Sequence, residues 1–207
     1  MKKTKQLTLF PNQTKKFFGG ALLYKKRKSR RPLSKKDCVH LVLRSEWSMG
    51  TDSFLAKRHY RVIKQLLQHF STKFGVRIYQ QAINSNHIHL LLRITNRALY
   101  TAFIKAVSGQ IACQIMGQQC FEDFVRTRKK ISKKTQKKNT AGDGSNPQGF
   151  WQFRPFSRIV NWGPDFKSAV SYLKQNILEA FGFVNYKPRK NYYSAWIQHA
   201  APVLSTG

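Results

Sequence analysis

Acidic residues are nearly missing from this sequence of 207 residues. Only eight Asp and Glu face 38 Lys and Arg, so the formal net charge is +30 at pH 7. Such a chain repels itself and attracts polyanions, which makes nucleic acid the expected partner. An anionic membrane surface would attract it too, but that partner calls for a basic amphipathic helix or a lipidation signal, and the sequence shows neither clearly.

Long apolar runs and paired cysteines are missing as well. The chain has no run of 18 apolar residues, so we expect no membrane span, and the apolar part of its N-terminus is too short for a signal peptide. The three cysteines (Cys38, Cys113 and Cys120) form no C-x-x-C pair, which favours reduced thiols in a cytosolic protein over disulfides or a zinc site. No G-x-x-x-x-G-K-[ST] loop is present either, which argues against a nucleoside triphosphate as energy source.

The basic residues gather in two segments. Residues 1–36 carry thirteen Lys and Arg and no acid, which predicts a flexible basic arm, although a solvated tail that only aids solubility has the same composition. Residues 126–149 are a basic loop insertion in a domain over 37–183, and 184–207 are an aromatic and basic tail. The side chains expected to contact phosphates are Lys25, Lys26, Arg27, Lys28, Arg30, Arg31, Arg128, Lys129, Lys130, Lys133 and Lys134.

The hydrophobic pattern predicts alternating strands and helices in the order β-α-β-β-α-β-α. Apolar and β-branched runs predict the strands, and apolar residues every three or four positions predict the helices. The expected strands are 37–45, 76–83, 87–94 and 150–160, and the expected helices are 55–70, 97–116 and 164–181. The first six elements match the split β-α-β, or ferredoxin-like, arrangement, an α+β fold with two helices on one face of an antiparallel sheet.

Two histidines in "NSNHIHLLLRI" need an explanation. Side chains alternate along a strand, so His87 and His89 share one face, while Ile88 and Leu90 share the other. The apolar face should lie under the two helices, and the histidines should point to the open face of the sheet. Imidazoles ~7 Å apart along a strand can converge on one metal ion. The alternative is a pair of ordinary polar surface residues.

The last helix offers a candidate for the third ligand. Tyr172 and Asn176 are four residues apart, so they stack on one side of it, at the border of its apolar stripe. A tyrosine hydroxyl and an amide oxygen are thus presented together. Several aromatic side chains could also stack on unpaired bases, although most are expected to be core residues. These are Trp47, Trp151, Phe153, Trp162, Tyr192, Tyr193 and Trp196.

These motifs carry a family resemblance. The sequence resembles that of the single-tyrosine HUH transposases at four places. "HIHLLL" resembles their histidine–hydrophobic–histidine (HUH) motif, and "SYLKQN" resembles their tyrosine helix. "CVHLVLRS" with His40 resembles their first strand, and "FWQFRPFSRIV" resembles their last strand. These are bacterial insertion-sequence transposases and their REP-associated relatives, and the likeness spans about 37–183. In the REP-associated group "NP" often follows the tyrosine helix, whereas in this chain Asn176 is followed by Ile177. Its arm and its 126–149 segment also look longer than the minimum of the family.

The resemblance implies a DNA-nicking and strand-transfer enzyme of a mobile element, acting in the bacterial cytosol at the nucleoid. Tyr172 would be the catalytic nucleophile, and His87, His89 and Asn176 would bind Mg²⁺ or Mn²⁺. His40 would line the site or be an ordinary strand residue. The expected partner is single-stranded DNA, including hairpin-forming ends, with a 5′-phosphotyrosine intermediate. Monomer and homodimer are both left open.

Three other readings remain. A non-catalytic RNA-binding module has the same order of elements, but the [KR]-G-[FY]-[GA]-F-V-x-[FY] signature is absent. A domesticated relative would keep the fold and bind nucleic acid without moving DNA. A replication or conjugation relaxase usually places its histidines after the tyrosine or uses a third histidine as ligand, whereas here the histidines come first.

Overall fold

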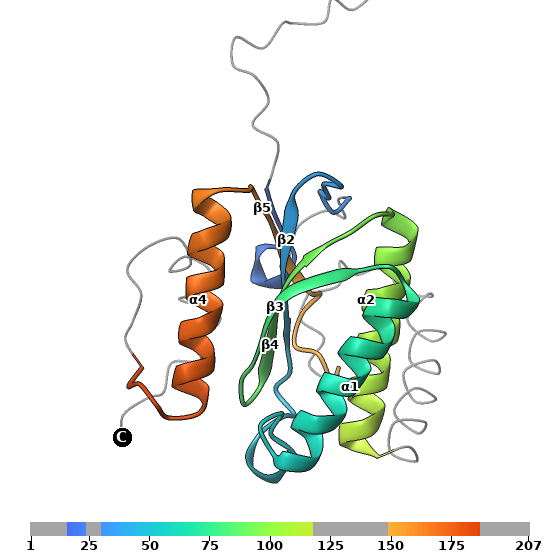
Figure 1. Ribbon diagram of the computed structural model, residues 1–207. Helices are drawn as coiled ribbons and strands as arrows, with labels where there is room; N and C mark the ends of the chain where they lie inside the picture. Colours follow the sequence, from blue (N-terminus) through green and yellow to red (C-terminus); the bar gives the residue numbers. More distant parts are fainter. Residues whose placement is uncertain (1–15, 24–29, 118–148, 187–207) are drawn as a thin grey trace, which may run out of the picture.

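A computed structural model of the chain describes residues 16–23, 30–117 and 149–186. A sheet forms the middle layer, and helices lie on both of its faces (Figure 1). The strands are β1 (Phe17–Phe18), β2 (Cys38–Arg44), β3 (Arg77–Ile83), β4 (His87–Arg93) and β5 (Phe156–Val160). The helices are the short 3-10 helices η1 (Gly20–Leu23) and η2 (Gly50–Asp52) and the α-helices α1 (Lys57–Lys73), α2 (Arg97–Met116) and α4 (Pro164–Ala180).

The sheet confirms the predicted ferredoxin-like arrangement. Its strand order is β1-β5-β2-β4-β3, and every neighbouring pair is antiparallel. The segment from β2 to β5 therefore follows the split β-α-β plan, and β1 extends the sheet at one edge. The two edge strands are β1 and β3.

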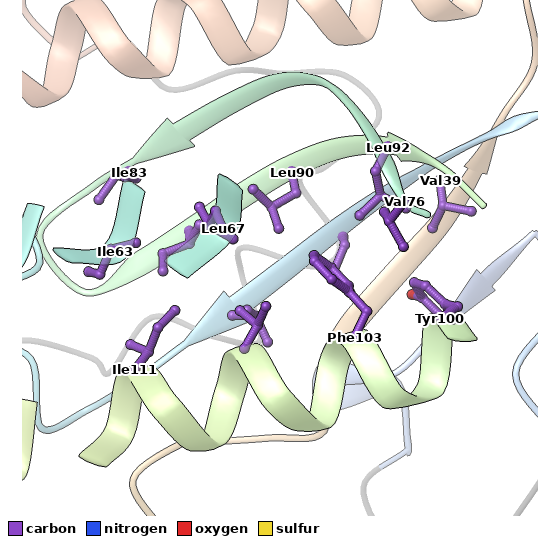
Figure 2. Packing of buried hydrophobic residues seen from close by; sticks show 14 of the residues in the cluster. Val39, Ile63, Leu67, Val76, Ile83, Leu90, Leu92, Tyr100, Phe103 and Ile111 are labelled. Carbon is purple, nitrogen blue, oxygen red and sulfur yellow. The ribbon is translucent and has the colours of Figure 1, made fainter. Parts of the chain in front are cut away.

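The larger core lies between the sheet and the pair α1 and α2. Leu90 and Leu92 of β4 face Phe103 and Ile111 of α2 there (Figure 2). A smaller cluster lies on the other face, where Leu91 of β4 packs with residues of α4. The additional helix thus covers the second face of the sheet (Figure 1). None of the helices in the described residues is long and apolar enough to span a bilayer.

Local signals explain where the helices begin and end. The side chain of Asn96 accepts a hydrogen bond from the Ala98 amide at 2.7 Å, so it caps α2 as the sequence predicts. Gly75 (φ +59°) separates α1 from β3 in a conformation that favours glycine. Pro164 is the first residue of α4, where its missing N–H costs no helical hydrogen bond.

Two predictions about segment boundaries need correction. The predicted strand 150–160 begins only at Phe156, because Pro155 lacks an N–H for the ladder, and Trp151 forms an isolated bridge with Ser45. Part of the predicted basic arm belongs to the fold, since β1 pairs with β5. The arm was assigned on charge alone, and charge does not reveal a two-residue strand. Most of the 126–149 insertion and of the 184–207 tail lies outside the described residues.

Arg31 ties this segment to the sheet. Its guanidinium donates to the Ser157 hydroxyl at 2.5 Å and to the Pro155 carbonyl at 2.7 Å, and it lies 4.5 Å from the centre of the Phe18 ring. Burial lowers the pKa of Arg31 below its ordinary value. These contacts give Arg31 a structural role and argue against its predicted contact with DNA phosphates.

Candidate active site

The two histidines of β4 face α4. Alternation places Ile88 and Leu90 in the core against α1 and α2, and turns His87 and His89 to the opposite face together with Leu91. This is the face that the sequence assigned to them. It is not open, however, because α4 packs over it, and His89 is only 1% exposed.

Tyr172 of α4 meets the histidines at this face. Its ring centre lies 5.6 Å from that of His89, and the His87 and His89 rings lie 4.8 Å apart, edge to face. Leu173, the next residue of α4, packs into the buried cluster beside Leu91 and fixes the rotation of the helix. The structure thus brings together the predicted nucleophile and both predicted histidine ligands.

Asn176 follows one helical turn after Tyr172 and is only 5% exposed. Its side-chain nitrogen donates to the backbone carbonyl of Tyr172 at 2.7 Å. Such a bond back along the helix fixes the amide group. Since the nitrogen is used in this way, the amide oxygen is the atom with which Asn176 would bind an ion.

His40 of β2 also belongs to the site. Its Nε2 lies 3.1 Å from Nδ1 of His89, and the two rings are stacked with centres 5.3 Å apart. The centre of the Tyr172 ring lies 6.0 Å from that of His40. This position beside His89 and Tyr172 favours a role for His40 in the candidate site over that of an ordinary strand residue.

Burial keeps the imidazoles of His40 and His87 neutral. It lowers the pKa of His40 to about 3, with a further contribution from the charge of Arg158. It also lowers the pKa of His87 to about 4, helped by the charge of Arg44. Arg158 and Arg44 are the strand partners of His40 and His87, so their charges lie on the same face. A neutral imidazole is the form that binds metals.

Two asparagines hold the ring of His87. The Asn84 side-chain nitrogen lies 2.8 Å from Nε2 of His87, and the Asn86 side-chain oxygen lies 2.8 Å from Nδ1. This pattern requires the proton on Nδ1, which donates to Asn86, and the lone pair on Nε2, which accepts from Asn84. Sequence reasoning assigned both asparagines to a turn only. Their spacing of one and three residues from His87 was the signal for a further role.

Arg158 is a third residue that sequence reasoning missed. It is buried on β5 and pairs with Asp165 of α4 at 2.9 Å. Asp165 also accepts from the Asn161 amide at 3.0 Å. The ion pair joins β5 to the first turn of α4, the helix that carries Tyr172. An arginine inside the short strand "FSRIV" was the available signal, because unpaired charges are rarely buried.

The described residues contain no group of three His, Cys, Asp or Glu side chains arranged for a metal ion. A site made of His87, His89 and Asn176 would not count as such a group, because its third ligand would be an amide oxygen. Of the predicted phosphate contacts, Arg30 is exposed, and all the others except Arg31 lie outside the described residues. These others are Lys25, Lys26, Arg27, Lys28, Arg128, Lys129, Lys130, Lys133 and Lys134.

Comparison with known proteins gives a family match. The family model described as "Transposase IS200 like" matches residues 34–152, a span that includes both histidines of β4 and ends before β5 and α4. No curated protein matches the chain. Two transposases are among the solved structures that are similar to it. One is a REP-associated tyrosine transposase bound to a REP hairpin, with 12% identity, a TM-score of 0.47 and coverage of 88% of this chain and 92% of the other. The second is a putative transposase from Deinococcus radiodurans, with 16% identity, a TM-score of 0.38 and coverage of 73% and 98%.

Proposed function

Because the chain belongs to the family of IS200-like transposases, we propose that it cuts and rejoins single-stranded DNA with Tyr172 as its nucleophile. One observation carries this proposal. The Tyr172 ring lies beside His89 and His40, with ring centres 5.6 and 6.0 Å away, although the three residues come from α4, β4 and β2. A tyrosine with only a packing role has no need of two buried imidazoles around it.

The reaction follows from the position of the tyrosine. The Tyr172 oxygen attacks the phosphorus of a phosphodiester in line and forms a 5′-phosphotyrosine. The bond to the 3′ oxygen breaks, Tyr172 gives up its hydroxyl proton, and the departing oxygen takes one up. A 3′-hydroxyl of another strand then attacks the phosphotyrosine and restores Tyr172. The number of phosphoester bonds stays the same, so no external energy source is required.

We propose that His87, His89 and Asn176 hold a divalent ion. They offer two imidazoles and one amide oxygen, and burial lowers the pKa of His87 to about 4, so no proton competes for its ring at neutral pH. When bound, Mg²⁺ or Mn²⁺ would polarise the phosphate oxygens. An uncharged ligand set leaves the full charge of the ion to the phosphate and suits moderate affinity. The amide oxygen favours Mg²⁺ and Mn²⁺, whereas the two imidazoles would also suit zinc and similar metals.

The substrate class follows from charge and resemblance. Phosphates bind to lysine and arginine with a steep dependence on salt, and this chain has a net charge of +30. The HUH and tyrosine motifs resemble those of enzymes that act on single strands and hairpins.

The test is a covalent adduct. End-labelled single-stranded oligonucleotides, including hairpins and the sequence that flanks the gene, are incubated with the protein and Mn²⁺ or Mg²⁺. We expect a labelled protein band on a denaturing gel, and its loss with EDTA or in Tyr172→Phe. Tyr186→Phe is the matched control, because Tyr186 is 62% exposed and lies outside the site. Tight binding without any adduct would instead support a DNA-binding protein that has lost catalysis.

A further inference from the structure

An aromatic cluster lies at the end of the sheet where α4 begins, away from the histidines. It consists of Tyr79, Trp162 and Phe166, and we call it the aromatic platform. The centre of the Trp162 ring lies 5.5 Å from that of Tyr79 and 4.9 Å from that of Phe166. Phe166 and Tyr79 pack against the buried cluster under α4, whereas Trp162 is 43% exposed. The platform thus joins the core to an accessible indole ring.

A β-bulge builds this platform. Ile78 pairs with Leu92 and Gln80 with Leu91, so Tyr79 is an extra residue in β3. A bulge redirects a side chain, and such irregularities occur often beside functional sites. Here Tyr79 packs on the α4 side of the sheet, with its ring perpendicular to those of Trp162 and Phe166.

The indole of Trp162 is held in place. Its Nε1 donates to the Lys36 carbonyl at 2.7 Å, and Phe166 and Tyr79 support the ring. Trp47 is also half exposed, but among the described residues its indole has neither a ring contact nor a hydrogen bond. A flat ring that is both fixed and exposed can stack on a ligand at little entropic cost.

Exposed cations surround the platform. Arg77 lies over the Tyr79 ring, 5.1 Å from its centre, and Arg93 donates to the Lys35 carbonyl at 3.3 Å. Arg77 and Arg93 are direct strand partners, and like charges at such positions destabilise a sheet. Among the described residues, no carboxylate forms an ion pair with either arginine. A bound anion between the two arginines would relieve their repulsion.

We propose that the aromatic platform binds an unpaired nucleotide of single-stranded DNA. The base stacks on Trp162, and the adjoining phosphates contact Arg77 and Arg93. This inference rests on the proposed function only for the choice of DNA as ligand. Base–aromatic stacking combined with basic side chains is the usual way in which proteins hold single strands without reading their sequence. In a duplex the base faces are covered by neighbouring pairs, so the platform selects unpaired DNA.

The position of the platform suits a substrate-guiding role. Phe166 and Tyr172 are six residues apart on α4, which corresponds to ~9 Å along the helix. A strand that stacks on Trp162 can therefore reach Tyr172 within a few nucleotides. The platform would hold the flanking strand while the phosphodiester lies at the histidines.

The test measures binding without cleavage. Tyr172→Phe protein in EDTA is titrated with a fluorescein-labelled single-stranded oligonucleotide and with the same oligonucleotide annealed to its complement, and anisotropy gives Kd. In this background, Trp162→Leu should weaken single-strand binding roughly fivefold to hundredfold and leave duplex binding unchanged. Trp162→Phe should retain most of the affinity, because it keeps an aromatic face. Melting temperatures of both variants show whether the fold is intact.

The phosphate contacts have their own readout. Arg77→Gln should lower the slope of log K against log salt by about one, whereas Lys105→Gln, on the far side of the sheet in α2, should not.

Equal losses for single strand and duplex in Trp162→Leu, or no loss, would overturn the proposal. So would tighter binding of the protein to vesicles of anionic phospholipid than to DNA, if that binding requires Trp162. The result is independent of the adduct assay, so each proposal can fail while the other stands.

Discussion

The Nε2 atom of His40 lies 3.1 Å from Nδ1 of His89, and both side chains are buried. One of these two nitrogens must carry the proton between them. If His89 binds an ion through Nε2, its proton sits on Nδ1 and is donated to His40. The low pKa of His40, about 3, keeps that ring a neutral acceptor. His40 would then act as a positioning residue that orients His89.

His40→Ala should therefore weaken metal binding. Loss of a hydrogen bond to a metal-binding histidine lowers the affinity for the metal roughly 10- to 100-fold. His40→Gln offers an amide oxygen to the Nδ1–H of His89 and should restore part of the lost metal affinity. Mn²⁺ affinity is measured by calorimetry or electron paramagnetic resonance, with the melting temperature as control for folding. Unchanged Mn²⁺ affinity in a folded His40→Ala protein would remove His40 from the site.

The two asparagines beside His87 should have opposite effects. Asn86 accepts from Nδ1 and so fixes the lone pair on Nε2, whereas Asn84 occupies that lone pair. Asn86→Ala should weaken Mn²⁺ binding, and Asn84→Ala should strengthen it because a competing donor is removed. The same Mn²⁺ titration checks both variants. Changes in the same direction would show that the two residues act only on the turn.

Much of this site could be predicted from the sequence, because its geometry follows from local rules. Alternation alone placed His87 and His89 on the face opposite Ile88, and helical spacing put Tyr172 and Asn176 together. What the sequence could not give was the packing between distant elements. The contact of His40 with His89 depends on strand register, and the pairing of β1 with β5 depends on two residues among many lysines. Neither leaves a periodic pattern.

The histidines should also make stability depend on pH. The folded protein has pKa values of about 3 for His40 and about 4 for His87, below the ordinary ~6.5. As pH falls from ~6.5, the unfolded chain binds protons that the folded chain does not, so the free energy of unfolding decreases. Each histidine contributes a slope of about 1.4 kcal/mol per pH unit until its folded pKa is reached.

Urea denaturation of the metal-free protein at several pH values between neutral and ~4 measures this slope. His87→Gln should make it shallower, because one titrating ring is removed. His69→Gln, at an exposed position of α1, is the matched control for the substitution itself. Equal slopes in wild type and His87→Gln would show that His87 titrates alike in the folded and unfolded chains.

Arg30 and Arg31 are neighbours in sequence with different expected roles. Arg31→Gln removes donors to Ser157 and to the Pro155 carbonyl and should cost about 1–3 kcal/mol of stability. Arg30 is exposed, so Arg30→Gln should change stability by less than about 0.5 kcal/mol. For DNA binding we expect the opposite pattern. Arg30→Gln should lower the salt dependence of DNA affinity, and Arg31→Gln should leave it unchanged. Denaturant titration and binding at several salt concentrations separate the two effects.

The last prediction concerns which chain supplies the tyrosine. Tyr172 lies against His89 and His40 of its own chain, and the Phe181 ring beyond α4 contacts Tyr60 of α1 with ring centres 5.8 Å apart. The helix is thus anchored at both of its ends, by Phe181 and by the ion pair between Asp165 and Arg158. Exchange of α4 between two chains would have to break both anchors.

Mixtures of Tyr172→Phe and His89→Ala proteins therefore test the arrangement. One variant lacks the nucleophile and the other a proposed ligand, so a mixed dimer regains a complete site only if α4 crosses between chains. We expect the mixture to form no covalent adduct, whereas wild-type protein at half the concentration does. An adduct in the mixture would mean that α4 can leave the position seen here, and the two anchors would then be weaker than their geometry implies.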